Sequence, residues 1–211
     1  METAERVAGI IAALKEEYPD PVCALQYRKD YELMIAVRLS AQCTDARVNI
    51  VTEKLFKQFP TLQSFADASE EEIAEAIKTC GLFRTKARDL KACAIMLLSE
   101  YDGKVPDNME DLLRLPGVGR KSANLILGDV FRQPGAVVVD THCIRLSNRM
   151  GLVDNDKDPV RIEKALRAVL PPEKSNDFCH RLVLHGRAVC TARKPLCDIC
   201  CCAAYCKTLN Q

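Results

Sequence analysis

Four cysteines near the C-terminal end of the sequence have the spacing of a metal site. Intervals of six, two and five residues separate Cys190, Cys197, Cys200 and Cys206. Four thiolates in a short, turn-rich segment can converge on one soft metal centre. Loops of this size suit a cubane iron–sulfur cluster or a tetrahedral zinc ion. A chance group of surface cysteines explains so compact a cluster poorly, so the spacing predicts a metal centre.

A disulfide framework is the competing interpretation of a sequence with 12 cysteines. Such frameworks belong mainly to small secreted domains, whereas this sequence has 211 residues and no apolar targeting segment at its start. The scattered cysteines fit a reducing compartment, and Cys80 and Cys93 are expected in the core. Two more thiols, Cys201 and Cys202, follow Cys200 directly. Neighbouring side chains point in different directions, so we keep Cys200 as the predicted ligand and expect the other two to be bystanders.

A glycine-containing turn is the second feature that could do chemistry. Between predicted helices over 109–114 and 123–130 it reads Leu115, Pro116, Gly117, Val118, Gly119, Arg120 and Lys121. Its two glycines allow a tight turn with exposed backbone N–H groups, while the side chain of Val118 is expected to be buried in the core. These amides and the start of the next helix form an anion site suited to phosphate, and the two basic residues add to it. On this motif alone, an ordinary turn between helices stays open.

Lys121 and Asp140 are the candidate catalytic residues. Lys121 lies at the start of a helix, where the macrodipole disfavours a cation and so favours a neutral, nucleophilic amine. Asp140 ends the apolar run 137–139 and precedes a predicted helix over 141–150. It is either a plain N-cap or a carboxylate that accepts a proton or faces a developing cation. Taken singly, a solvated lysine and a helix cap are the commoner roles.

Helical periodicity dominates the remaining sequence and predicts an all-α fold. Apolar positions at helical spacing are Val7, Ile10, Ile11 and Leu14; Ile73, Ala76, Ile77 and Cys80; Leu90, Cys93, Ala94, Leu97 and Leu98; Ala123, Ile126, Leu127 and Val130; Ile162, Ala165, Leu166 and Val169. Ser69 with Glu72 predicts a capping box, and Gly81 predicts a helix stop. The run 136–139 is expected to be a buried extended segment rather than part of a sheet.

Composition limits the possible partners. Hydrophobic residues make up 48% of the sequence, enough for a core, and no run approaches a membrane span. The formal net charge is only +1, so nucleic-acid binding would have to rest on local groups of basic residues. Breaks at Tyr18–Pro21 and Arg132–Gly135 predict two domains. We expect a cytoplasmic protein without a membrane partner.

Taken together, these motifs resemble one family. The stretches LPGVGRKSAN, VVVDTH and the four spaced cysteines, in this order, are similar to the endonuclease III family of helix-hairpin-helix DNA glycosylases. LSAQCTD (39–45) and CGLFRTKA (80–87) match further signatures of that family, and the resemblance runs along essentially the whole sequence. Each motif is weak alone, but the combination is specific.

The resemblance implies a two-lobed α fold and a base excision repair enzyme for oxidised pyrimidines. A helical barrel would span 22–133, and the second lobe, 1–21 with 134–211, would carry a 4Fe–4S cluster on Cys190, Cys197, Cys200 and Cys206. By analogy Lys121 attacks C1′ of the sugar and Asp140 assists it. The resulting Schiff base allows β-elimination, which cuts the strand. The implied partner is damaged or abasic double-stranded DNA, bound by a monomer associated with the nucleoid.

The resemblance also implies the DNA contacts. Gln42 would fill the gap left by the flipped nucleotide, and Leu82 would wedge into the opposite strand. The backbone would be held by Gly117, Val118, Gly119 and Arg120 of the turn and by Arg193 and Lys194 in the cysteine loop. His142, two residues after Asp140, stays open as a further contact, whereas His180 and His185 are expected to be structural.

Two other functions compete with this one. A mismatch glycosylase that removes adenine, thymine or uracil shares the fold, but such relatives generally have Ser or Tyr where Lys121 stands. A non-catalytic iron–sulfur DNA-binding protein would need neither Lys121 nor Asp140. The presence of both in register favours the bifunctional glycosylase and abasic-site lyase.

Overall fold

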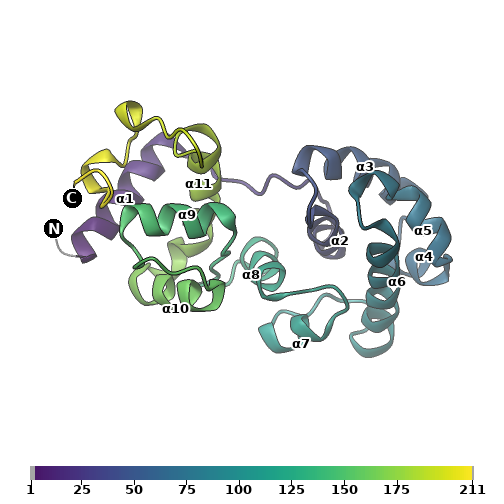
Figure 1. Cartoon of the computed structure of the whole chain (residues 1–211). Helices are drawn as coiled ribbons and strands as arrows, with labels where there is room; N and C mark the ends of the chain where they lie inside the picture. Colours follow the sequence, from purple (N-terminus) through teal and green to yellow (C-terminus); the bar gives the residue numbers. More distant parts are fainter. Residues whose placement is uncertain (1–2, 211) are drawn as a thin grey trace. The chain divides into compact units, whose positions relative to one another are not determined.

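The protein is built from α-helices. The structure, a computed structural model, describes residues 3–210 and contains in that range eleven α-helices, four short 3₁₀ helices and no strand (Figure 1). The predicted all-α class is therefore confirmed. The chain forms two compact units. One combines the residues up to Val22 with those from Arg132 onward, and the other is Cys23–Phe131. We call the first the cysteine unit and the second the hairpin unit.

The cysteine unit packs four helices around one core. They are α1 (Thr3–Glu17), α9 (Thr141–Met150), α10 (Pro159–Val169) and α11 (Ser175–Ala188), with 3₁₀ helices η2 (Pro172–Lys174), η3 (Cys197–Ile199) and η4 (Ala203–Tyr205). The predicted apolar stripe of α1 is buried, as are Leu146 of α9, Leu166 of α10 and Phe178 of α11. Burying each such side chain contributes about 1.5–3 kcal/mol, which fixes the helices that carry the cysteine segment.

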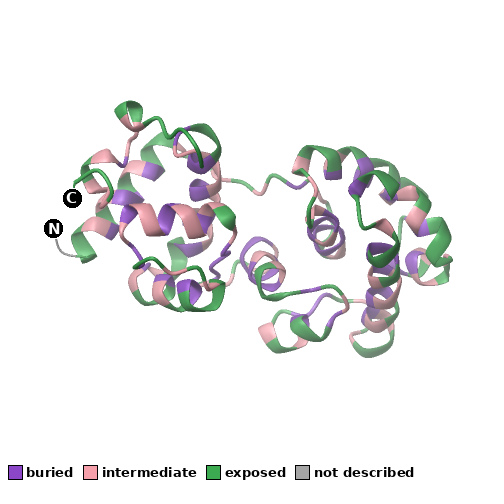
Figure 2. Cartoon of the chain, in the orientation of Figure 1, coloured by how far each residue is buried: buried purple, intermediate pink, exposed green. Residues whose placement is uncertain are grey.

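The hairpin unit contains the other seven α-helices. They are α2 (Asp30–Ser40), α3 (Asp45–Gln58), α4 (Leu62–Asp67), α5 (Glu70–Ala76), α6 (Phe83–Glu100), α7 (Met109–Arg114) and α8 (Arg120–Asp129), with η1 (Lys78–Cys80) between α5 and α6. The long α6 packs against α4 and α5, and its buried residues include Leu90, Cys93 and Leu97 (Figure 2). Cys80 and Cys93 are both buried, as predicted.

One predicted helix is shorter than its periodicity suggests. The pattern Ile73, Ala76, Ile77, Cys80 predicts a helix that runs to Gly81, but α5 ends at Ala76 and η1 follows. At Ile77 the backbone leaves the helical range (φ −108°, ψ 12°), and a 3₁₀ turn then buries Cys80. An i, i+3 spacing fits both helix types, so periodicity alone could not locate this change. The predicted capping box of Ser69 and Glu72 is present.

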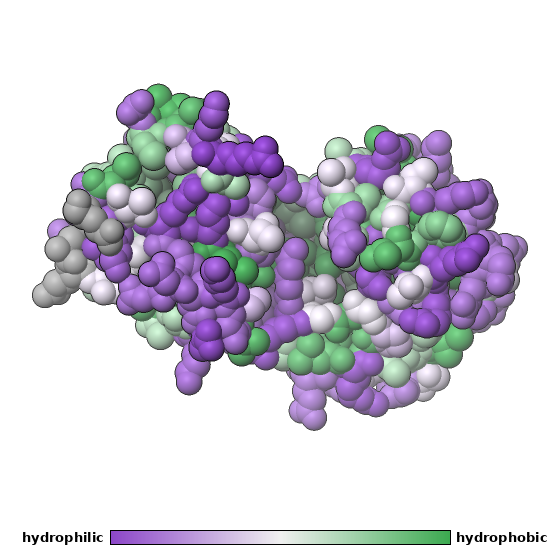
Figure 3. Space-filling model, in the orientation of Figure 1, coloured by the Kyte–Doolittle hydropathy of each residue, from purple (hydrophilic) through white to green (hydrophobic). Residues whose placement is uncertain are grey.

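The run 136–139 is extended, buried and unpaired with any strand, as predicted. Its path is fixed in part by the amide of Val138, which donates to Sγ of Cys179 in α11 at 3.3 Å. No helix among residues 3–210 has both the length and the apolar character needed to cross a membrane. On the face shown in Figure 3, hydrophilic residues dominate and hydrophobic ones form small separate groups.

Candidate functional site

The four predicted metal ligands line one cavity in the cysteine unit. This cavity, of about 190 Å³, is bounded by Cys190, Cys197, Cys200 and Cys206, by Cys202, and by apolar side chains that include Met150, Val189 and Leu196. Burial and the neighbouring thiols Cys200, Cys190 and Cys206 raise the pKa of Cys197. Neighbouring thiolates repel one another unless a cation lies between them, and four thiolates are a donor set that a soft metal centre binds.

Two arginines of α9 hold the start of the cysteine loop. Arg145 donates to the carbonyl oxygens of Gly186 (2.9 Å) and Cys190 (3.0 and 3.2 Å). Arg149 donates to Thr191 O at 2.8 Å and Ala192 O at 2.9 Å, and its Nη1 lies 3.3 Å from Sγ of Cys190. These bonds fix the loop on a regular helix and place a guanidinium charge beside a predicted thiolate ligand.

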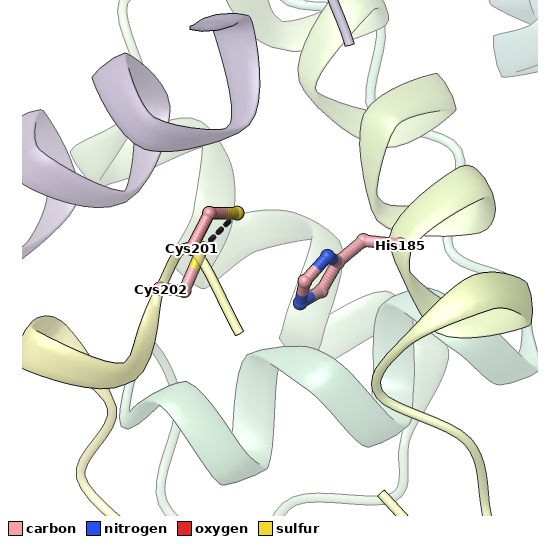
Figure 4. Close-up of side chains that lie close together, drawn as sticks. All are labelled: His185, Cys201 and Cys202. Atoms are coloured by element: carbon pink, nitrogen blue, oxygen red, sulfur yellow. Dashed lines mark hydrogen bonds between the residues drawn. The ribbon is translucent and has the colours of Figure 1, made fainter. Parts of the chain in front are cut away.

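Cys201 and Cys202 differ in their surroundings. Cys202 is fully buried, while Cys201 is half-buried and does not line the cavity. Their sulfur atoms lie 3.8 Å apart, and the ring of His185 from α11 faces them (Figure 4). His185, Cys201 and Cys202 form a group, among the described residues, whose ligand atoms lie within 4.8 Å of one another.

The same surroundings distinguish Cys200 from its two neighbours, Cys201 and Cys202. A hydrogen bond from Cys202, followed by one from His185, holds the pKa of the Cys200 thiol well below its usual range. Nε2 of His185 lies 3.3 Å from Cys200 Sγ, and Nδ1 lies 3.2 Å from the hydroxyl of Tyr18. His185 is therefore a buried structural residue that supports the cysteine segment. The exposed Arg193 and Lys194 lie in the loop between the first two cysteines.

The turn Leu115–Gly119 in the hairpin unit links α7 to α8. The amide of Val118 donates to Leu115 O at 3.1 Å, and Gly117 has φ +78°, so the turn needs a residue that accepts a left-handed backbone. A Cβ at Gly117 would also lie 2.6 Å from Nε of Arg38. Arg38 packs against the turn at Gly117. Its Nε and Nη2 donate to Oδ2 of Asp89 at 2.9 and 2.6 Å.

The outer side of this turn is open. No heavy atom lies within 4 Å of a Cβ built on Gly119, which is exposed and is the N-cap of α8 without a side-chain cap. Val118 is buried, as predicted, and Arg120 and Lys121 are exposed in the first turn of α8. The first N–H groups of a helix lack partners within it, so this end can receive an anion with a lysine amine beside it.

Asp140 is the N-cap of α9. Its Oδ1 accepts a hydrogen bond of 2.8 Å from the amide of Cys143, and the apolar segment before it is buried. The cap bond fixes the orientation of the carboxylate through Oδ1. His142, in the same helix, is half-buried. Its Nδ1 lies 3.2 Å from Nη2 of Arg145. A Cβ at Gly186 would lie 2.6 Å from the same Nδ1, so His142 packs closely on α11.

Gln42 and Leu82 share an unusual backbone conformation. Gln42 lies between α2 and α3 with φ +56°, and Leu82 precedes α6 with φ +47°. Left-handed backbone is rare for such side chains, and outliers of this kind gather at functional sites. Both side chains are exposed, Leu82 to 55%. An exposed apolar side chain on a strained backbone is consistent with a group that contacts a partner.

Comparison with known proteins agrees with this arrangement. The HhH-GPD superfamily model of base excision DNA repair proteins matches residues 35–172. Endonuclease III of Synechocystis sp. is 44% identical over 202 residues, which covers 96% of this chain and 92% of that protein. The structure of a trapped endonuclease III–DNA covalent intermediate matches with a TM-score of 0.93 and 37% identity, covering 100% of this chain and 98% of that one. A thermostable thymine-DNA glycosylase matches with a TM-score of 0.85 and 25% identity over 99% of this chain and 96% of its own.

This chain belongs to the HhH-GPD superfamily of base excision DNA repair proteins. Within that superfamily its curated relatives from Synechocystis, Haemophilus influenzae and Escherichia coli, at 41–44% identity, are all endonucleases III.

Proposed function

We propose that this chain is a bifunctional DNA glycosylase and abasic-site lyase that removes oxidised pyrimidines from duplex DNA. The position of Lys121 is the observation that carries the proposal. It places an exposed primary amine in the first turn of α8, beside uncovered amides that suit a phosphate. A primary amine forms a Schiff base with a sugar aldehyde, whereas a hydroxyl cannot, so lysine at this position favours a lyase as well as a glycosylase.

The reaction begins with attack of the Lys121 Nζ on C1′ of the damaged nucleotide. The N-glycosidic bond breaks, the base leaves with a proton, and the opened sugar becomes an iminium on the lysine. Loss of a C2′ proton then expels the 3′ phosphate by β-elimination, and water releases the enzyme. We assign to Asp140 the acceptance of the amine proton and the stabilisation of the cationic sugar, because its cap bond fixes the carboxylate before DNA arrives.

The DNA contacts follow from charge and exposure. Gly117, Val118, Gly119 and Arg120 of the turn would hold one phosphate segment, and Arg193 and Lys194 a second one, without reading the bases. Gln42 would fill the space left by the flipped nucleotide and Leu82 would enter the opposite strand. His142 would add a contact next to Asp140. A monomer is sufficient for this arrangement.

We assign a 4Fe–4S cluster to the cysteine cavity, on Cys190, Cys197, Cys200 and Cys206. Four thiolates on loops of six, two and five residues suit a cubane, and Arg149 beside Cys190 offsets part of its negative charge. When bound, the cluster would tie the loop that carries Arg193 and Lys194 to α9 and α11. Nothing in base release or β-elimination requires an electron, so its role here is structural.

A panel of lesion-containing duplexes tests the proposed function directly. We expect base release and strand cleavage with a 5,6-saturated thymine opposite adenine, and strand cleavage with a preformed abasic site. Thymine or uracil opposite guanine and adenine opposite guanine should be poor substrates. The thymine-DNA glycosylase likeness makes the mismatch enzyme the second candidate, and preferred release of thymine or uracil without strand cleavage would select it.

A further inference from the structure

Two loops of the hairpin unit meet on one buried lysine. Nζ of Lys86 in α6 donates to Leu39 O at 2.8 Å, to Ala41 O at 2.8 Å and to Cys80 O at 2.7 Å. Leu39 lies in the last turn of α2, and Ala41 is the C-cap of that helix and directly precedes Gln42. The third carbonyl belongs to the end of η1, two residues before Leu82.

The ammonium group is completely used by these contacts. It has three N–H donors, and three backbone carbonyls receive them. Lys86 is 0% exposed, and burial is the main cause that lowers its pKa. Helix ends leave carbonyl groups without partners, so one side chain here satisfies the ends of two helices whose residues lie as far as 47 positions from it in sequence.

The backbone beyond each of these carbonyls is strained. Gln42 follows Ala41 in a turn closed by the Cys43 amide, which donates to Ser40 O at 3.0 Å, and its φ of +56° is one that glycine would adopt readily. Leu82 has φ +47° and accepts, through its carbonyl, the amide of Lys86 at 3.0 Å. Such conformations persist only where surrounding contacts hold them. Lys86 supplies contacts to both loops from one atom.

We propose that Lys86 is a positioning residue, which sets the distance between Gln42 and Leu82 so that both enter the duplex at the same lesion. This inference rests on the proposed function, because it takes the DNA roles of those two side chains as given. It adds that the two loops act as one rigid unit joined through a buried ammonium. Lys86 touches neither the DNA nor the reacting atoms in this account.

The test compares Lys86→Met with Lys91→Met. Methionine keeps most of the buried volume and removes the three donors. Lys91 is the matched control, because it lies on the same helix and its Nζ donates to Ala66 O (2.9 Å) and Ala68 O at the end of α4, away from Gln42 and Leu82. Each variant is assayed under single turnover on lesion-containing duplex and on single-stranded abasic DNA, which needs no wedge.

We expect Lys86→Met to slow excision from the duplex by about ten- to a hundredfold, since small misplacements of positioning groups have effects of this size. Cleavage of single-stranded abasic DNA should change by less than about threefold, and Lys91→Met should behave as the parent protein on both substrates. A second readout uses 2-aminopurine placed opposite the lesion, whose emission rises when the base is unstacked. That rise should be smaller for Lys86→Met at saturating protein.

The outcomes distinguish a failure of the proposed function from a failure of the positioning role of Lys86. A parent protein that cleaves neither substrate would defeat the proposed function. If the parent is active and Lys86→Met loses activity equally on both substrates, the positioning role is wrong. The same holds if Lys86→Met leaves the 2-aminopurine signal unchanged. Should Lys86→Met fail to fold, Lys86→Arg serves instead. Arginine keeps the charge, but its planar donors cannot converge on three carbonyls. The Lys86→Arg variant should therefore show the same loss of excision on duplex DNA alone. If this loss is absent, the inference is wrong.

Discussion

At the scale of single residues, Asp140 is the N-cap of α9, and we have proposed a chemical role for the same carboxylate. Its Oδ1 caps α9 by accepting from the amide of Cys143, and this bond fixes the orientation of the carboxylate. A structural role and a chemical role are therefore compatible here, and they can be separated by a change that keeps one and removes the other.

Replacing Asp140 by Asn separates them. Asn caps helices about as well as Asp, so we expect the free energy of unfolding to change by less than about 1 kcal/mol. Base release should slow by about a hundredfold or more, because a neutral amide neither accepts the amine proton nor faces a cationic sugar. Single-turnover kinetics and a melting curve measure the two effects.

Asp158→Asn is the matched control for this change. Asp158 caps α10 in the same unit by accepting from the amides of Val160 (2.8 Å) and Arg161 (3.3 Å), and has no assigned chemistry. It should leave base release unchanged. An Asp140→Asn protein as active as its parent would contradict the assignment.

Lys194 carries a second prediction at this scale. It is exposed in the loop that Arg145 and Arg149 fix to α9, where it would meet a phosphate. Lys194→Ala should weaken binding to all duplex sequences alike and reduce the slope of log affinity against log salt by about one unit. Binding titrations over a series of salt concentrations measure the slope. An effect on only one lesion, with the slope unchanged, would point to a different role.

At the scale of elements, the hairpin turn makes unequal demands on its two glycines. Gly117 has positive φ and packs on Arg38, whereas Gly119 has φ −100° and open space around it. Gly117→Ala should therefore destabilise the protein by about 2–4 kcal/mol, from backbone strain and overpacking together. Gly119→Ala should cost less than about 1 kcal/mol. Chemical denaturation measures both, and equal losses would show that the turn is not held as described.

The elements show what could be predicted from the sequence and what could not. Local patterns such as the apolar stripe of α1, the capping box at Ser69 and the short α7 depend on nearby residues, and all were predicted. The end of α5 at Ala76 was not, because α and 3₁₀ turns share the i, i+3 spacing. Lys86 was missed for a different reason. Its three acceptors come from two segments, and a lysine in an amphipathic helix is usually exposed, so only the fold reveals it.

At the scale of the whole molecule, the cysteine cavity should make the cysteine unit depend on its metal. We expect a brown protein with about four iron and four sulfide per chain. Changing Cys190, Cys197, Cys200 or Cys206 to Ser should release iron and destabilise this unit, whereas Cys201→Ser and Cys202→Ser should retain it. Metal analysis, visible absorption and thermal unfolding measure this. Stoichiometric zinc in anaerobically purified protein, or iron loss in Cys202→Ser, would contradict the ligand assignment.

The candidate catalytic residues come from different units, Lys121 from the hairpin unit and Asp140 from the cysteine unit. The predicted domain bounds, 22–133 for one domain and 1–21 with 134–211 for the other, remain a prediction. The more immediate question is whether the amine of Lys121 reaches C1′.

Borohydride trapping on abasic-site duplex answers that question most directly. Borohydride reduces the iminium to a stable amine, so we expect a covalent protein–DNA adduct whose peptide map places the DNA on Lys121. Lys121→Gln should still bind the duplex, since backbone amides hold the phosphate, yet form no adduct and cut no strand. An adduct on a different lysine, or undiminished trapping by Lys121→Gln, would contradict the account.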